Sequence, residues 1–388
     1  MMKKLAVFEA IAVLVGTIIG AGVFTLPYIA ANSGMVITIT WLVIVSFIIM
    51  FLHLSFGEIV LRTKEDYRLP GYIGHYLNSS AKRFVLLITF LTFAFSLLIF
   101  LLLGSQFLGV IIDFFFSGVT FPQGFLVILI WLFLSLIVLT NGKKLSKINF
   151  YLSFLLLFLL LVIVVFSSLH FEIENLNFFE FSNKWGWLIP YGAIFFALNG
   201  MVAIPEAAKV LEKRKEDKKK LKKVIIIGTI LPVLCYLAFM VTVVGVSGSA
   251  TTLETVQGLK GILGESIILL GAGLGFLAVV TSYLIFASYI KNSFINDFKW
   301  TPFISYFLVI VGPLLIYFLQ LENLVKLISF TGGMLGGFEG IMILLVLKQA
   351  KKQSDLDPPY QVPLNTALVV ILITAFIIGA LCQTFLVY

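Results

Sequence analysis

The chain has 388 residues, of which 60% are hydrophobic and only 12% are charged, and its formal net charge is +8. A soluble domain carries about a quarter charged residues, so this chain has too little polar surface to cover a water-soluble globule. Its two cysteines and three scattered histidines exclude a disulfide framework and a histidine–cysteine metal cluster. We therefore expect an integral membrane protein.

Long uncharged segments predict transmembrane helices, for example at 84–112, 224–253 and 300–321. A helix needs about 20 apolar residues to cross about 30 Å of hydrocarbon. Strands of a membrane barrel would be about ten residues long and would alternate in polarity. The predicted fold class is an all-α polytopic membrane protein. Its eleven predicted spans are 5–31, 36–60, 84–112, 124–140, 148–169, 187–207, 224–247, 265–290, 302–320, 324–347 and 364–387.

The lysines and arginines predict the orientation of these spans. If the N-terminus is cytosolic, 24 of the 27 fall in or beside cytosolic loops, and the others are Lys184, Lys260 and Lys326. Cytosolic loops of membrane proteins are enriched in these residues. We expect a multi-pass protein of the cell membrane with a cytoplasmic N-terminus and an extracytoplasmic C-terminus. The basic segment 209–223 is then a loop beside anionic lipid, and no nucleic-acid partner is expected.

The first predicted span contains Gly16, Gly20 and Gly22, followed by Pro27. Each glycine weakens a helix by roughly 1 kcal/mol. Inside a membrane, freed backbone groups are tolerated only where they are buried in protein or line a cavity. Alternatively, the glycines only permit close helix packing, as in GxxxG contacts.

The sixth predicted span repeats this pattern, because Pro205 follows Gly200 at the spacing that separates Pro27 from Gly22. The offset between the two glycines, 178 positions, also relates the starts of spans three to five to those of spans eight to ten. Five helices per repeat is an odd number, so the second repeat must be inverted. Matching interruptions in inverted repeats indicate a substrate site at the membrane midplane. The predicted domains are a first repeat at 1–180, an inverted second repeat at 181–350, and a cytosolic linker with an eleventh helix at 351–388.

These residues resemble the amino acid–polyamine–organocation superfamily. The segment GTIIGAGVFTLPYIAANSG (16–34) resembles the first-helix signature of its aromatic and hydroxy amino acid permease branch, which is similar to the amino acid/auxin permeases. The segment VTSYLIFASYIKNSFINDF (280–298) is similar to the eighth helix of that branch. The resemblance covers about residues 5–347. It implies a leucine-transporter-type 5+5 fold and transport by alternating access.

The resemblance places an amino acid substrate between the two breaks. Backbone N–H groups of the first break would bind its carboxylate, because a helix N-terminus favours an anion. Carbonyls of the second break would receive its ammonium group, with Phe195 and Phe196 as gates or pocket walls. Neither break contains a charged side chain, which favours small neutral L-amino acids with apolar, aromatic or hydroxylated side chains. The implied substrate residues are Thr17, Ile19, Gly20, Ala21, Gly22, Phe195, Phe196, Asn199 and Gly200.

The resemblance also implies a candidate sodium site; no cofactor is expected apart from such a bound Na⁺. Its ligands would be the carbonyls of Gly16, Ile19 and Ala278 and the hydroxyls of Thr281 and Ser282. Oxygen ligands suit a hard cation, although the same hydroxyls could simply bond back to carbonyls of their own helix. Proton-coupled relatives carry a lysine in the fifth helix where this chain is aliphatic. Sodium is therefore favoured slightly over protons.

Carboxylates inside predicted spans are also functional candidates. Glu206 follows the second break, and Glu339 lies in the glycine-rich segment 332–340, so either could carry a proton or act as a gate. Converging catalytic groups are missing from the spans, so no enzyme is expected. The sequence predicts a secondary active transporter that works by cation-coupled symport. An amino-acid sensor or channel with the same fold is the alternative, and the oligomeric state stays open.

Overall fold

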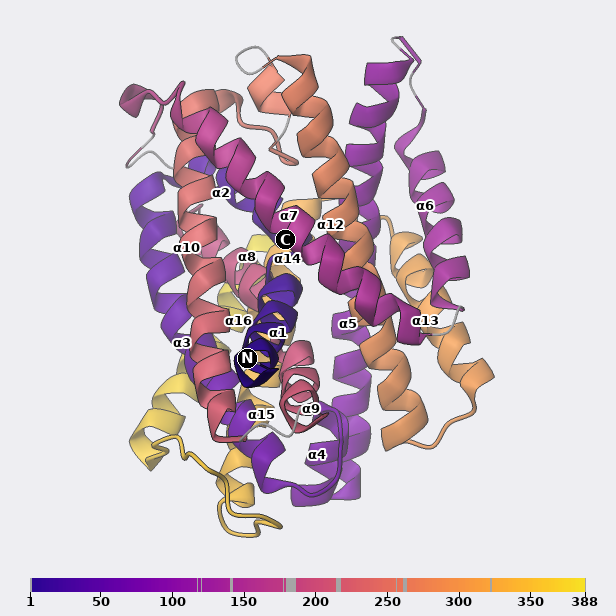
Figure 1. Cartoon of the computed structure of the whole chain (residues 1–388), viewed down its shortest axis with the longest axis vertical. Helices are drawn as coiled ribbons and strands as arrows, with labels where there is room; N and C mark the ends of the chain where they lie inside the picture. The colour runs from indigo at the N-terminus through magenta and orange to yellow at the C-terminus, as the bar shows by residue number, and fades with distance from the viewer. Residues whose placement is uncertain are drawn as a thin grey trace.

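The computed structural model describes residues 2–387 except 117, 120, 140–141, 177, 179–185, 214–217, 256, 261–263 and 322. Every regular element in this part of the chain is a helix. Most helices run lengthwise through the molecule, whereas α7 crosses its neighbours obliquely (Figure 1). The all-α prediction is confirmed.

The helices follow the predicted spans in chain order, with short 3₁₀ and π segments between them. The bounds are α1 (Met2–Ile18), η1 (Ala21–Thr25), α2 (Leu26–Ser33), α3 (Met35–Arg62), α4 (Leu69–Tyr76), α5 (Ser79–Phe115), α6 (Gln123–Val138), α7 (Gly142–Ser168), η2 (Ile173–Asn175), η3 (Gly186–Leu188), α8 (Ile189–Leu198), η4 (Met201–Ala203), α9 (Ile204–Lys213), η5 (Lys218–Lys220), α10 (Leu221–Ser247), η6 (Gly248–Ala250), η7 (Gln257–Leu259), α12 (Glu265–Asn292), η8 (Ser293–Asp297), α13 (Pro302–Tyr317), α14 (Leu324–Phe330), η9 (Thr331–Gly336), α15 (Gly337–Ala350) and α16 (Thr366–Val387).

Seven helical segments of the described chain are long and apolar enough to cross a membrane, or eight if the bent pair α1 and η1–α2 is one span. Three shorter apolar helices lie at the predicted fourth, fifth and ninth spans, in α6, α7 and α13. Each predicted span thus has a helix in its place. A multi-pass membrane protein is confirmed, and the count of eleven crossings stays a prediction.

Both predicted helix breaks are present. The first span bends by 43° between its two halves, and Gly20 at the break has extended backbone angles, φ −117° and ψ −153°. In the second, α8 ends at Leu198, and Asn199 leaves the helical region with ψ 102°. The chain then resumes helical structure at Met201. The glycines therefore mark real interruptions.

The perimeter of the bundle is strongly apolar. More than half of the side-chain surface is exposed for Phe133 on α6, Phe303 on α13 and Ile371 on α16. A soluble monomer rarely exposes large contiguous apolar areas. These side chains are therefore placed to contact lipid.

Two local features were missed by the sequence analysis. The short helix α4 lies within a loop predicted to be cytosolic, and π-helical turns occur at Ser293–Asp297 and Thr331–Gly336. Turns of this kind inside α-helices are frequent at functional sites. Here they end α12 and connect α14 to α15.

Glycines let the second broken helix pack directly against the backbone of the α14–η9 segment. A Cβ built on Gly192 of α8 would lie 2.1 Å from the carbonyl oxygen of Ser329. A Cβ built on Gly332 would lie 2.0 Å from the carbonyl oxygen of Gly192. Because backbone atoms cannot rotate aside as a side chain can, no larger residue fits without separating these helices.

We predict that Gly192→Ala lowers the stability of the protein by about 1–3 kcal/mol, the usual cost of overpacking. Thermal unfolding in detergent would measure the loss. Gly273→Ala on α12 is the matched control, because a Cβ there meets nothing within 4 Å. Equal melting temperatures for the two variants would contradict the close contact.

Candidate functional site

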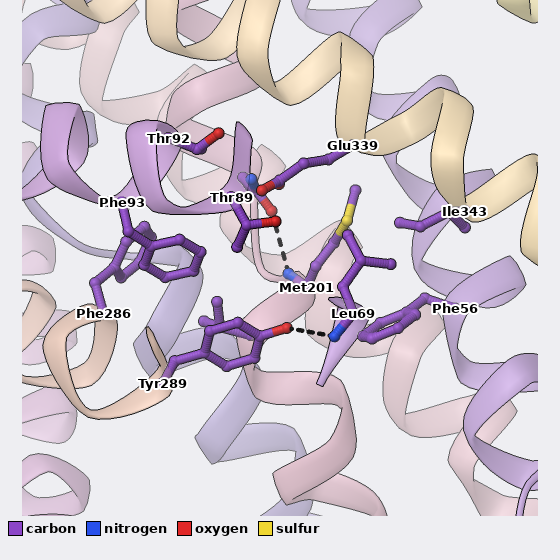
Figure 2. A pocket seen from close by; sticks show the side chains of 12 residues that line it. Phe56, Leu69, Thr89, Thr92, Phe93, Met201, Phe286, Tyr289, Glu339 and Ile343 are labelled. Atoms are coloured by element: carbon purple, nitrogen blue, oxygen red, sulfur yellow. Dashed lines mark hydrogen bonds between the residues drawn. The ribbon is translucent and has the colours of Figure 1, made fainter. Parts of the chain in front are cut away.

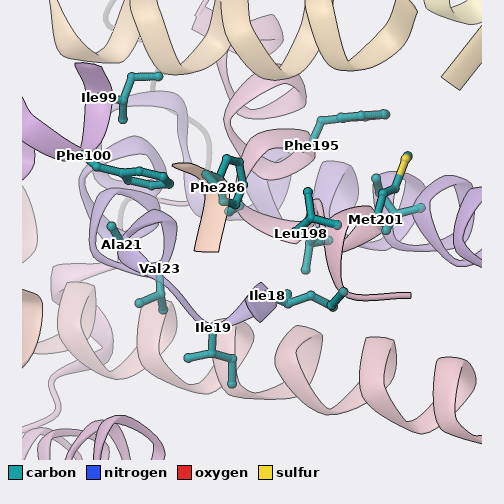
Figure 3. Packing of buried hydrophobic residues seen from close by; sticks show 14 of the residues in the cluster. Ile18, Ile19, Ala21, Val23, Ile99, Phe100, Phe195, Leu198, Met201 and Phe286 are labelled. Atoms are coloured by element: carbon teal, nitrogen blue, oxygen red, sulfur yellow. The ribbon is translucent and has the colours of Figure 1, made fainter. Parts of the chain in front are cut away.

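The two breaks lie against each other inside the bundle. A Cβ built on Gly22 would lie 2.9 Å from Cα of Ala197, and one built on Gly200 would lie 2.5 Å from Cγ1 of Ile18. Figure 3 shows both breaks within one cluster of buried apolar side chains. Glycine is needed at both positions because each helix interruption contacts the other.

One tyrosine on α10 connects the two breaks. The Tyr236 hydroxyl lies 2.5 Å from the carbonyl oxygen of Ile18 and 3.0 Å from that of Ala197. Carbonyls at the end of a helix have no partner within it. Tyr236 is fully buried, so its single hydroxyl hydrogen is shared between two acceptors that water cannot reach.

A histidine on α3 supports the second break. Nε2 of His53 lies 3.1 Å from the N–H of Gly200, and Nδ1 lies 2.9 Å from the Thr229 hydroxyl on α10. Because Nε2 accepts the Gly200 hydrogen, the neutral ring carries its own hydrogen on Nδ1 and donates it to Thr229. In the sequence, His53 is one of three scattered histidines. An ionisable side chain within an apolar span was the signal that could have identified it.

The two half-helix ends that meet at the site carry opposite partial charges. Ala21 and Gly22 are the first residues of η1, so their N–H groups have no acceptor within that helix. Across from them, α8 ends at Leu198, where the carbonyls of the last turn make the negative end of the helix. The Asn199 side chain occupies this end and accepts the N–H of Met201 at 3.2 Å. The arrangement suits a zwitterion.

Aromatic side chains flank the breaks (Figure 3). The rings of Phe100 on α5 and Phe286 on α12 meet edge to face at 5.3 Å, and the ring of Phe196 lies 6.0 Å from that of Phe100. Phe195 packs instead on Phe376 of α16, at 6.0 Å. Of the two predicted wall residues, only Phe196 joins the aromatic group beside the breaks.

The residues predicted to bind sodium come together in part. A Cβ built on Gly20 would lie 2.3 Å from the Ser282 hydroxyl oxygen, so α12 contacts the first break directly. The Thr281 hydroxyl donates to the carbonyl of Ala278 at 2.9 Å, as expected for a threonine that bonds back to its own helix. The Ser282 hydroxyl therefore lies at the first break, whereas the Thr281 hydroxyl is hydrogen-bonded to its own helix.

The other predicted residues of the first break lie at the end of α1. Gly16 and Thr17 belong to its last turn, and the Thr17 hydroxyl donates to the carbonyl of Val13 at 2.8 Å. The N–H of Ile19 still bonds to the carbonyl of Val15 at 2.7 Å. Helical bonding therefore continues up to Gly20, where it stops.

A small cavity lies beside the second break (Figure 2). Its volume is about 20 Å³, enough for about one water molecule. Glu339 of α15 points into it and is buried (Figure 2), and Asn199 also lines it. The Thr89 hydroxyl also lines the cavity and has no partner within the described chain. Glu339 is thus near the second break, as a coupling residue would need to be.

Glu206 occupies a different environment, at the start of α9. Its carboxylate pairs with Arg68 at 2.9 Å and with Lys209 at 3.6 Å, and its side chain is half exposed. The backbone N–H of Arg68 also contacts the Asp297 carboxylate at 3.3 and 3.4 Å. Arg68, which the sequence analysis counted only as a loop cation, therefore links the second broken helix to the end of α12.

We predict that Tyr236→Phe destabilises the protein by about 1–3 kcal/mol, because two buried carbonyls lose their donor. Thermal unfolding in detergent is the measurement. Tyr191→Phe is the matched control, since the Tyr191 hydroxyl is buried without a hydrogen-bond partner in the described chain. If the two variants have the same melting temperature, the hydrogen bonds of Tyr236 do not stabilise the breaks.

Comparisons with known proteins are consistent with this geometry. The sequence model of the family described as "Tryptophan/tyrosine permease family" matches residues 3–383. A search of curated proteins finds no match. Among solved structures, the chain is similar to Mhp1, a nucleobase-cation-symport-1 family transporter, in a closed conformation with bromovinylhydantoin bound. The TM-score is 0.62 at 14% identity, with 98% of this chain and 91% of that chain covered.

At this identity the likeness to Mhp1 shows the fold, and the family match extends over nearly the whole chain. The chain therefore belongs to the tryptophan/tyrosine permease family of the amino acid–polyamine–organocation superfamily, and it is a secondary transporter with a leucine-transporter-type fold, not an enzyme.

Proposed function

We propose that the chain carries neutral L-amino acids with aromatic, apolar or hydroxylated side chains across the cell membrane by alternating access. The observation that carries this proposal is the contact between two broken helices that present opposite ends to each other. The α-carboxylate would bind the N–H groups of Ala21 and Gly22. The ammonium group would bind carbonyls at the end of α8, together with Asn199.

The lining of the breaks supports a neutral substrate with a ring. The side chains flanking them include Phe100, Phe196 and Phe286, and aromatic pairs add about 0.5–1.5 kcal/mol to burial. A charged substrate side chain would require a buried counter-ion. The family description, which names tryptophan and tyrosine, agrees with an aromatic substrate.

Transport requires the breaks to separate. The cavity beside the second break, at about 20 Å³, is far too small for an amino acid, whose pocket would measure some hundreds of Å³. The substrate therefore enters when η1 and α8 move apart. The ion pairs of Arg68 and Glu206 would close the cytosolic side while the outer side opens, which gives Glu206 the role of a gate residue.

For coupling, we favour sodium over protons. Ser282 lies against Gly20, so an ion held by Ser282 and the carbonyls of Gly16, Ile19 and Ala278 would join α12 to the first break. Thr281 would have to turn its hydroxyl from Ala278 to the ion. Under proton coupling, Glu339 would be the carrier, because it lies next to Asn199 in the cavity.

Uptake by proteoliposomes tests the transport proposal. We expect saturable uptake of L-tryptophan or L-tyrosine that needs an imposed gradient and releases unmodified substrate. Gly22→Ala should lower uptake about tenfold or more, because its Cβ would lie 2.9 Å from the backbone of Ala197 and push the two breaks apart. A rise of about 1.4 kcal/mol in the transport barrier is enough for a tenfold loss of rate.

The control for this experiment is Gly273→Ala, which should transport normally. Substrate binding without any flux would support the sensor alternative, and flux that never saturates would support a channel. Uptake that Gly22→Ala leaves unchanged would contradict the placement of the substrate.

The coupling ion is tested by removing the two hydroxyls on α12. We predict that Thr281→Val with Ser282→Ala abolishes the stimulation of uptake by sodium and leaves weak sodium-independent uptake, since both changes nearly preserve volume. Glu339→Gln should keep the sodium dependence. If wild-type uptake ignores sodium and follows a pH gradient that Glu339→Gln makes ineffective, the coupling ion is a proton.

A further inference from the structure

A second pocket lies outside the region of the breaks, between α5, α6 and the loop that connects α10 to α12. We call it the outer pocket. Its volume is about 280 Å³, and its lining includes Gln106, Val110, Phe121, Leu126, Glu254 and Gln257. The charge pattern of the loops predicts that this face is extracytoplasmic. The outer pocket therefore lies on the side from which an imported substrate would arrive.

Two acceptors in the lining of the outer pocket are buried and have no donor within the described chain. Glu254 is only 7% exposed, and its Oε1 has no hydrogen-bond partner within the described chain. The side-chain oxygen of Gln106, which lines the pocket from α5, is also buried and unpartnered there. A buried carboxylate is strongly unfavourable unless a cation or hydrogen-bond donors accompany it.

Glu254 forms no ion pair with a cation of the described chain. Lys260, on the same loop, pairs with Glu265 at 3.6 Å, and no ion pair to Glu254 is present among the described residues. The Gln123 amide is directed to Ser105 at 3.4 Å. Glu254 thus lines the outer pocket without a cation of its own among the described residues.

The rest of the lining is apolar. Phe121, Val110 and Leu126 form this part of the outer pocket. An inorganic cation would gain nothing from such a surface, whereas a primary ammonium group attached to an apolar or aromatic body would satisfy both parts.

The loop that carries Glu254 also contacts the first break. The next residue, Thr255, has a positive φ of 70°, and its hydroxyl donates to the carbonyl of Phe24 in η1. A threonine rarely adopts this backbone conformation. A ligand bound at Glu254 would therefore lie next to Thr255, which contacts η1. In the proposed transport cycle, η1 is the half-helix that moves.

We propose that the outer pocket binds primary ammonium compounds with an apolar body, and that it is the first binding site of the amino acid on its way to the breaks. Glu254 and the Gln106 oxygen receive the ammonium group, and Phe121, Val110 and Leu126 contact the side chain. The role in transport rests on the proposed function, whereas recognition of the ammonium group does not.

Calorimetric titration of the full chain in detergent tests the outer pocket directly. The probe is tryptamine, which has the ammonium group and the indole ring but lacks the carboxylate that the first break requires. Glu254→Gln should weaken tryptamine binding about tenfold or more, as expected when a charged hydrogen bond is lost. Glu265→Gln, on the same face but exposed and paired with Lys260, should bind like wild type.

Two further probes define the ligand class. Indole-3-propionate lacks the ammonium group and should not compete with tryptamine, and methylammonium lacks the apolar body and should compete only weakly. The proposal is overturned if the wild-type protein and Glu254→Gln bind tryptamine with equal affinity. It is also overturned if the wild-type protein does not bind tryptamine. If methylammonium binds as tightly as tryptamine, the apolar body contributes nothing and the assigned ligand class is wrong.

This result can be separated from the transport proposal. Gly22→Ala should lose uptake and keep its binding of tryptamine, because Gly22 is not part of the outer pocket. Glu254-dependent binding of tryptamine in a protein that transports no amino acid would refute the transport function alone. Normal amino acid uptake by wild type together with tryptamine binding that ignores Glu254 would refute the outer pocket alone.

Discussion

A backbone group without a partner inside a bilayer costs roughly several kcal/mol, because no water is present to replace the missing bond. Each broken helix creates such groups, and each obtains partners from a continuous neighbouring helix. Tyr236 of α10 serves the carbonyls of Ile18 and Ala197, and His53 of α3 serves the N–H of Gly200. The breaks can therefore exist only in contact with α3 and α10, which joins these helices into one unit around the site.

The contacts that must separate during transport differ in kind. At the breaks, Gly22 and Gly200 allow backbone to meet apolar atoms at van der Waals distance, and separation leaves a space that a ligand must fill. On the side predicted to be cytosolic, Arg68 and Glu206 form an ion pair with a half-exposed carboxylate. Arg68 is buried, so this pair is open to water only at the Glu206 carboxylate. Opening the centre thus needs a ligand to fill the space, whereas opening the cytosolic side needs water or another partner for the two charges.

The sequence was sufficient to predict what depends on local pattern. Long apolar segments predicted the positions of the helices, and the glycines near Gly20 and Gly200 predicted both breaks. The partners of the breaks could not be predicted, because His53 lies 147 residues from Gly200 and Tyr236 lies 218 residues from Ile18. Only tertiary packing decides which histidine or tyrosine meets which backbone group. The neighbours of Phe195 and Phe196 could not be predicted for the same reason: adjacent residues of a helix point in different directions, and Phe195 packs on Phe376 of α16.

The shared hydroxyl of Tyr236 bears on the step in which the transporter is empty. An ammonium group arriving at the end of α8 brings three hydrogens, and it would compete with the tyrosine for the carbonyl of Ala197. When the ammonium group leaves, the tyrosine hydrogen can occupy that acceptor again. Under the proposed function, Tyr236 would thus replace part of the substrate while the transporter is empty, so that few carbonyls would be left without a donor during reorientation.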